Sequence, residues 1–119
     1  MWKQPGRLAA WVGVRVVELP AEIDHDSASD VQAALTSALT AGVTVLVADM
    51  TATGYCSLEG VQVLVRGRRA AQAAGAQFRL AAVAPAVRRI LEFTGTSALL
   101  GVYSGLDAAR DGQESSAPG

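Results

Sequence analysis

Side chains able to do covalent or acid-base chemistry gather at two places in this sequence. Residues 55–60 read YCSLEG, which brings a thiol, a hydroxyl and a carboxylate together, and residues 22–26 read EIDHD, which holds the only histidine, His25. A serine served by a histidine and an acid would be the machinery of acyl transfer. Ser57 lacks the flanking glycines of the hydrolase pattern G-x-S-x-G, and no phosphate loop of the form G-x-x-x-x-G-K-[ST] exists. We therefore expect no enzyme activity and no cofactor.

The run Asp24, His25, Asp26 raises the question of a metal site. Three consecutive side chains point in different directions, which is more typical of a polar turn before a helix than of a metal site, so no metal is expected. Cys56 is the only cysteine, which excludes an internal disulfide and fits a protein of the reducing cytoplasm. Its thiol is either activated by the N-terminus of a following helix or buried as a small apolar side chain, and burial is the commoner state.

Composition and charge narrow the class of protein. The chain has 119 residues, of which 50% are hydrophobic, so it can bury the core of one domain and is too short for two. Ten lysines and arginines against eleven acidic residues leave no basic field for nucleic acid or anionic lipid. The apolar run 8–14 is far shorter than the roughly 20 residues that span a bilayer, so no membrane partner is expected either. We expect a domain over residues 1–110 and a disordered polar tail over 111–119.

Hydrophobic periodicity predicts alternating strands and helices. The Val-rich stretch 8–19 predicts a strand or short hairpin with a turn or bulge at Gly13. The uncharged run 43–49 predicts a central strand that is covered on both faces. Between these strands, a capping-box pattern at Ser27 opens an amphipathic helix that we expect to end at Gly42.

A second helix is predicted over residues 57–74, with Ser57 as its N-cap and Gly75 at its C-terminal end. Inside it, Gly67 costs roughly 1 kcal/mol relative to alanine unless close packing requires a glycine. We assign three arginines to the solvated face of this helix: Arg66, Arg68 and Arg69.

The C-terminal third continues the alternation. It predicts a strand over 78–83, a helix over 84–95, a short strand over 99–103 and one or two helical turns over 104–109. This order of strands and helices predicts an α/β fold with a mainly parallel sheet, because parallel strands need crossover helices.

Four segments together carry a resemblance to a known family: ELPAEID (18–24), VTVLVADMTATGYCSLEGVQVLV (43–65), AGAQFRLAAVAPAVRRILEFTG (74–95) and GVYSGLDAA (101–109). From about Val14 to Ala109 the chain resembles the STAS domain of the bacterial anti-sigma factor antagonists. The resemblance implies a small sheet with helices packed largely on one side. It also implies binding to an anti-sigma factor, a switch-type serine kinase, which frees a sigma factor and so regulates transcription.

The family's phosphorylation motif is altered in this chain. Gly60 and Val61 match its Gly-Leu pair, but Ser57 stands where the family has Asp, Leu58 where it has the phosphorylated serine, and Glu59 where it has a second serine or threonine. Leucine cannot accept a phosphate. The resemblance therefore implies the fold and the binding surface without the usual switch, and it leaves Ser57 as the candidate acceptor one position early.

The implied partner-binding surface comprises the loop before the second helix and the turn before the first: Asp24, His25, Thr53, Gly54, Tyr55, Cys56, Ser57, Leu58, Glu59 and Val61. We expect a monomer or a weak homodimer. Two other functions stay open: a sensor of nucleotides or other small molecules, and a component of a larger signalling assembly. The amides that open the second helix could receive an anion, although Glu59 opposes one there.

Overall fold

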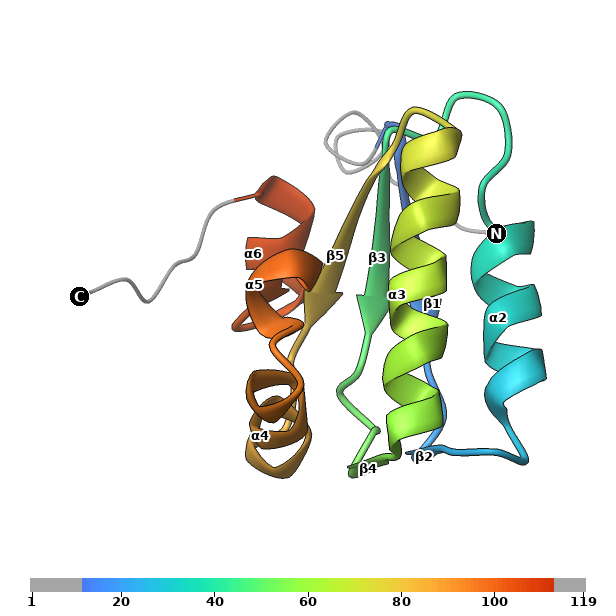
Figure 1. Cartoon of the computed structure of the whole chain (residues 1–119). Helices are drawn as coiled ribbons and strands as arrows, with labels where there is room; N and C mark the ends of the chain where they lie inside the picture. The colour runs from blue at the N-terminus through green and yellow to red at the C-terminus, as the bar shows by residue number, and fades with distance from the viewer. Residues whose placement is uncertain (1–11, 113–119) are drawn as a thin grey trace.

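Four parallel strands form the sheet at the centre of the molecule (Figure 1). The computed structural model describes residues 12–112. The strands lie in the order β1-β3-β5-β6: β1 Val14–Glu18, β3 Val45–Asp49, β5 Gln77–Ala81 and β6 Val102–Tyr103. β3 is flanked on both sides, and its residues 46–48 are fully buried. The predicted α/β fold with a parallel sheet and a central strand in the run 43–49 is confirmed.

Two helices, α2 (Ala28–Ser37) and α3 (Leu58–Ala73), pack against each other on one face of the sheet. Helices α4 (Pro85–Phe93) and α5 (Ser97–Leu100) extend the same core. Its fully buried leucines come from helices and strands alike: Leu35, Leu46, Leu64, Leu80, Leu91 and Leu100. None of the helices within residues 12–112 combines the length and apolar character needed to cross a bilayer.

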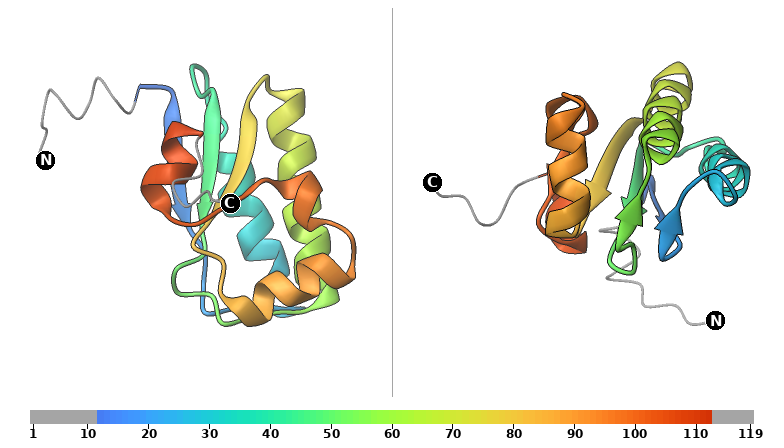
Figure 2. Two further views of the ribbon diagram at one scale, coloured as in Figure 1. Left: turned by 90° about the vertical axis from the view of Figure 1, so that its left-hand side faces the viewer. Right: turned by 60° about the horizontal axis from the view of Figure 1, so that its bottom comes forward.

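A single short helix, α6 (Leu106–Asp111), covers the opposite face of the sheet (Figure 2, left). Its Ala109 packs with Val47 and Ala81 in a second, smaller apolar cluster. The helices of the described residues are thus largely on one side, as the resemblance implied, with α6 as the exception.

Arg79 of β5 attaches α6 to the sheet. Its Nη1 donates to the carbonyl oxygens of Ala109 at 2.8 Å and Arg110 at 3.3 Å, and its guanidinium lies 5.8 Å from the centroid of the Tyr103 ring. A cation at the C-terminal end of a helix neutralises the unpaired carbonyl groups there, so this half-buried arginine holds α6 in place.

Three predicted boundaries are wrong. The first helix ends at Ser37 rather than Gly42, which lies beyond it with a φ of +90° in the following turn. The predicted strand 99–103 is divided, because its first two residues end α5 and only Val102–Tyr103 pair with β5. Asp111 belongs to α6 rather than to a tail.

Several other predictions of the elements hold. Gly13 makes the predicted turn with a φ of +81°, and the strand over 78–83 is present as β5. The helices predicted over 57–74 and 84–95 are present as α3 and α4, and the last helical turns as α6. The expected strand residues 8–11 and the tail 113–119 lie outside the described residues.

A two-stranded parallel pairing, which the sequence did not indicate, ties two loops together. Its strands are β2 (Glu22–Ile23) and β4 (Tyr55–Cys56), and the hydrogen bond from Ser57 N to Ile23 O at 2.9 Å continues the ladder. This pairing places the turn before α2 beside the start of α3.

Two glycines of α3 permit its close packing. A Cβ atom at Gly67 would lie 2.9 Å from Leu35 Cδ1 of α2, so the glycine lies at a close contact between the two helices, which is the condition under which the sequence allowed for it. A Cβ atom at Gly60 would lie 2.5 Å from Ile23 O and 2.8 Å from Cys56 Sγ. Backbone cannot move aside as easily as the end of a leucine, so Gly60 is the stricter requirement.

Replacement of Gly60 by alanine should destabilise the fold by about 1–3 kcal/mol, because the new methyl group overlaps the Ile23 carbonyl. Gly54→Ala in the same loop is the matched control, since a Cβ there meets nothing within 4 Å, and it should stay within about 0.5 kcal/mol of wild type. Urea unfolding measures both. Equal stabilities of the two variants would contradict the close approach.

Candidate functional site

The loop between β3 and α3 is held by short internal hydrogen bonds. Asp49 Oδ1 accepts from Thr51 N at 3.0 Å and from Thr51 Oγ1 at 2.6 Å, which makes the turn as the strand ends. Thr53 Oγ1 donates to Pro20 O at 2.7 Å, and this side chain is only 1% exposed. The loop is therefore anchored to the end of β1 and presents its remaining residues from a fixed frame.

Ser57 is the N-cap of α3. Its backbone is extended, with φ −81° and ψ 175°, and its Oγ accepts a hydrogen bond from Gly60 N at 3.1 Å. The same hydroxyl donates to Ile23 O at 3.4 Å. The predicted capping role of this serine is confirmed, and its hydroxyl is engaged both as donor and as acceptor.

The turn before α2 is organised by Asp24 rather than by a capping box. Asp24 Oδ1 accepts from the backbone N–H groups of Asp26 and Ser27, each at 3.1 Å. Ser27 Oγ donates to Glu22 O at 2.8 Å and makes no capping bond to α2, so the predicted role of Ser27 is wrong although its position at the helix start is right. Because the turn needs this hydroxyl, the first amides of α2 lose it as a cap.

His25 and Glu59 connect the two loops. His25 Nδ1 lies 3.0 Å from Glu59 Oε1 and 3.2 Å from Oε2, across 34 residues of sequence. The hydrogen bond and negative charge of Glu59 raise the pKa of His25, and the carboxylates of Asp26 and Asp24 add to the effect. The imidazole is 85% exposed and is held beside the first turn of α3 by the Glu59 carboxylate. The positive N-terminal end of the α3 dipole also stabilises this carboxylate.

Cys56 is buried and chemically quiet. Its side chain is 4% exposed, and burial raises the pKa of the thiol to about 11. The thiol consequently stays protonated near neutral pH, which matches its interpretation as a small apolar residue and not as a nucleophile.

The predicted binding residues divide into an exposed and a buried set. Large exposed apolar side chains are Tyr55, 53% exposed, and Leu58, 59% exposed. We call the group His25, Tyr55, Leu58 and Glu59 the α3 cap surface, in which Glu59 alone is half-buried. Gly54 is exposed beside it, and Asp24 and Ser57 are half-buried. The buried residues can only support this surface from beneath: Thr53, Cys56 and Val61.

A shallow groove continues from the α3 cap surface along α3. It has a volume of about 450 Å³ and is bounded by α3 and the turn between α4 and α5: Leu58, Val61, Gln62, Val65, Arg66, Arg69, Thr94 and Thr96. Sequence reasoning assigned Arg66 and Arg69 to a solvated face, and both are exposed. It missed the groove, because Thr94 and Thr96 meet α3 only in the folded chain.

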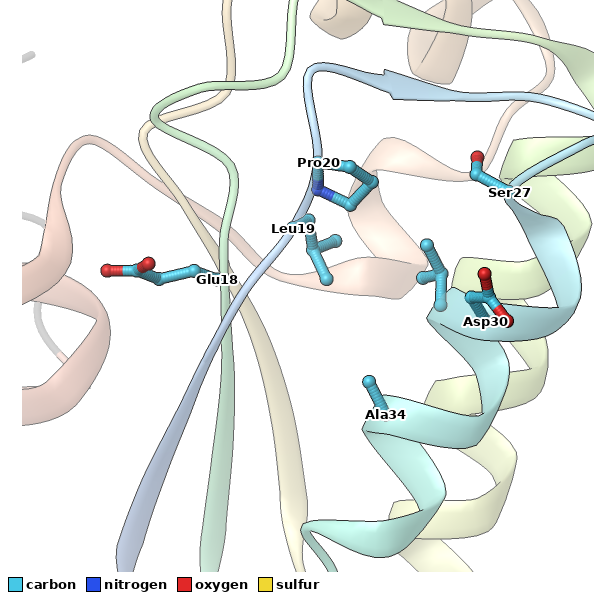
Figure 3. Close-up of a pocket in the computed structure, with 7 residues that line it drawn as sticks. Glu18, Leu19, Pro20, Ser27, Asp30 and Ala34 are labelled. Carbon is cyan, nitrogen blue, oxygen red and sulfur yellow. The ribbon is translucent and has the colours of Figure 1, made fainter.

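A second cavity, about 370 Å³ in volume, lies between the end of β1 and α2 (Figure 3). In this view the Glu18 carboxylate points away from α2, whereas Ser27, Asp30 and Ala34 lie on the helix side. Leu19 lies between Glu18 and the helix. Its polar groups do not converge on a common point. Within residues 12–112 no three His, Cys, Asp or Glu side chains come together in a way that would hold a metal ion.

Fold and sequence together define a class of regulatory α/β domain, and the STAS domain family model matches residues 10–109. The chain belongs to the STAS domain family. Curated proteins provide no match to the sequence.

Solved structures of the same fold include proteins of two kinds. An anti-sigma factor antagonist from Mycobacterium paratuberculosis is 27% identical with a TM-score of 0.74, covering 84% of this chain and 85% of its own. A putative antagonist from Thermotoga maritima is 16% identical with a TM-score of 0.74, covering 84% and 86%. A sulfate transporter family protein from Wolinella succinogenes is 19% identical with a TM-score of 0.73, covering 83% of each chain. The last two show the shared fold alone.

Loss of the Ser57 cap should lower the free energy of unfolding. Ser57→Ala should cost about 1 kcal/mol, because Gly60 N loses its acceptor. Ser57→Thr is the matched control: its hydroxyl can still accept from Gly60 N and donate to Ile23 O, so it should stay close to wild type in stability. Thermal and urea unfolding compare the three proteins, and a stable Ser57→Ala protein would contradict the capping role.

The His25–Glu59 pair should be visible in a pH titration. NMR of the imidazole should give a pKa above the ordinary 6.5, and Glu59→Gln should lower it towards that value. Asp26→Asn, the control, should lower it less. Since the folded pKa is raised, the pair's stabilisation is complete below pH 6.5 and is lost as pH rises through the folded pKa. A Glu59→Gln protein with an unchanged His25 pKa would disprove the pairing in solution.

Proposed function

We propose that this protein is an anti-sigma factor antagonist that binds a switch-type serine kinase through the α3 cap surface and so regulates sigma-factor-dependent transcription. The usual phosphoserine is replaced by Leu58, so kinase activity does not release the complex. A partner that uses ATP would place the protein in the cytoplasm. Membership of the STAS family and the 27% identity to the mycobacterial antagonist support the partner class.

The observation that carries the proposal is the exposure of Leu58. It is the first residue of α3 and is 59% exposed at the position that the resemblance assigns to the phosphorylated serine. An exposed leucine beside an exposed Tyr55 is typical of a protein contact, since apolar and aromatic side chains supply most of the binding energy at the centre of an interface. Neither side chain of the pair Leu58 and Glu59 offers a hydroxyl.

Ser57 is poorly suited to replace the missing acceptor. Its Oγ caps Gly60 N and donates to Ile23 O, so phosphorylation would remove the donor to Ile23. Glu59, two residues away, would add like-charge repulsion to the new phosphate. We therefore infer that the hydroxyl serves the fold and leaves the surface without a phosphate switch.

The partner class can be tested by affinity capture. The wild-type chain should recover a switch-type kinase from lysate of the source organism, identified by mass spectrometry. Leu58→Asp should reduce recovery about tenfold or more, since it places a charge at a desolvated contact, whereas Leu58→Met keeps the apolar volume and should retain binding. Recovery of no such kinase, or equal recovery by the aspartate variant, would overturn the proposal.

A further inference from the structure

We infer that the groove along α3 is the second half of the partner contact and that its occupant is an amphipathic helix with acidic edges. This inference rests on the proposed function only for the partner's identity. The groove begins at Leu58, so a partner that covers the α3 cap surface has the groove directly beside it.

The dimensions and floor of the groove fit a short helix. Leu58, Val61, Val65 and Arg69 follow one another at intervals of three and four residues, which aligns them along one face of α3. From Leu58 to Arg69 this face is about 16 Å long, the length of three helical turns. Recognition of one helix in a groove of this kind depends on apolar anchors at the same intervals. The apolar floor ends at two arginines, which make the far half of the groove basic.

These arginines are available to a partner. Arg66 Nη1 contacts only the neutral Gln32 Oε1, at 3.5 Å, and neither Arg66 nor Arg69 forms an ion pair among residues 12–112. Helices α3 and α4 together hold five arginines and only two glutamates, and the C-cap of α4, Thr94, lines the groove. In the part of the chain that the structure describes, Arg66 and Arg69 are the only charged residues that line the groove, so its charged groups are positive although the whole chain carries a formal charge of −1.

Acidic residues gather between β1 and the start of α2. From β1 to the first turn of α2 the chain has five carboxylates: Glu18, Glu22, Asp24, Asp26 and Asp30. The only arginine in the same stretch is Arg15. An acidic helix is attracted to the arginines of the groove and repelled by these carboxylates. Charge therefore favours the groove as its binding site.

Two stapled helical peptides of three turns are suitable probes for the full-length protein. Both have leucines at i, i+4 and i+7; one has glutamates along both edges, and the other has lysines there. In ¹H–¹⁵N NMR the glutamate peptide should shift the amides of residues 58–69 and 94–96, and its affinity should fall as salt is raised. The double variant Arg66→Glu/Arg69→Glu should bind the glutamate peptide about tenfold or more weakly than wild type and should prefer the lysine peptide instead. Arg15→Glu/Arg68→Glu, with the same change in net charge outside the groove, should bind as wild type does.

The outcomes separate the two proposals. Equal binding of both peptides, no binding of either, or shifts that map outside the groove would overturn the acidic-helix inference, even if a switch-type kinase still binds. Self-association of the free protein through residues 58–69 would overturn it in favour of a second copy. If the glutamate peptide occupies the groove but no such kinase is recovered, the inference holds and the proposed function fails.

Discussion

The carbonyl oxygen of Ile23 is the point on which the site depends. It accepts Ser57 N at 2.9 Å, receives the Ser57 hydroxyl at 3.4 Å, and lies where any Cβ at position 60 would collide with it. α3 can begin at this depth only because Gly60 has no side chain. The contact fixes the turn before α2 against the start of α3, and this is why His25 and Glu59 meet across 34 residues.

A surface built on this frame can bind at low entropic cost. The supporting side chains Thr53 and Cys56 are buried, whereas Tyr55 and Leu58 project from backbone that is already hydrogen-bonded in place. Binding then orders few additional side chains, so the entropic cost is low and a larger share of the free energy of the apolar contacts appears as affinity. Beside this apolar surface, the groove presents Arg66 and Arg69, whereas the segment from β1 to α2 carries mostly carboxylates, a difference in charge that would favour one orientation of a partner.

Local patterns predicted the elements and the cap, but not the contacts between distant segments. The uncharged run of β3 and the serine at the start of α3 were each readable from short stretches, whereas the contact of Gly67 with Leu35 joins two helices and was not. The β2–β4 pairing was not, because two-residue strands have no periodicity to detect. The helix at Leu99 was mispredicted because apolar residues near a glycine fit a strand or a helix equally well until tertiary packing decides. The early end of α2 leaves residues 38–42 outside the helix, a boundary that periodicity alone does not fix.

The most direct test of phosphate-independent binding uses the purified kinase recovered with the wild-type chain. Its affinity is measured by calorimetry before and after the complex is incubated with MgATP, and the intact mass of the chain is recorded on the same sample. We predict an unchanged Kd and an unchanged mass, while the control Leu58→Ser/Glu59→Ser gains a phosphate and releases the kinase. A wild-type chain that gains the mass of one phosphate and loses its kinase would contradict the central claim.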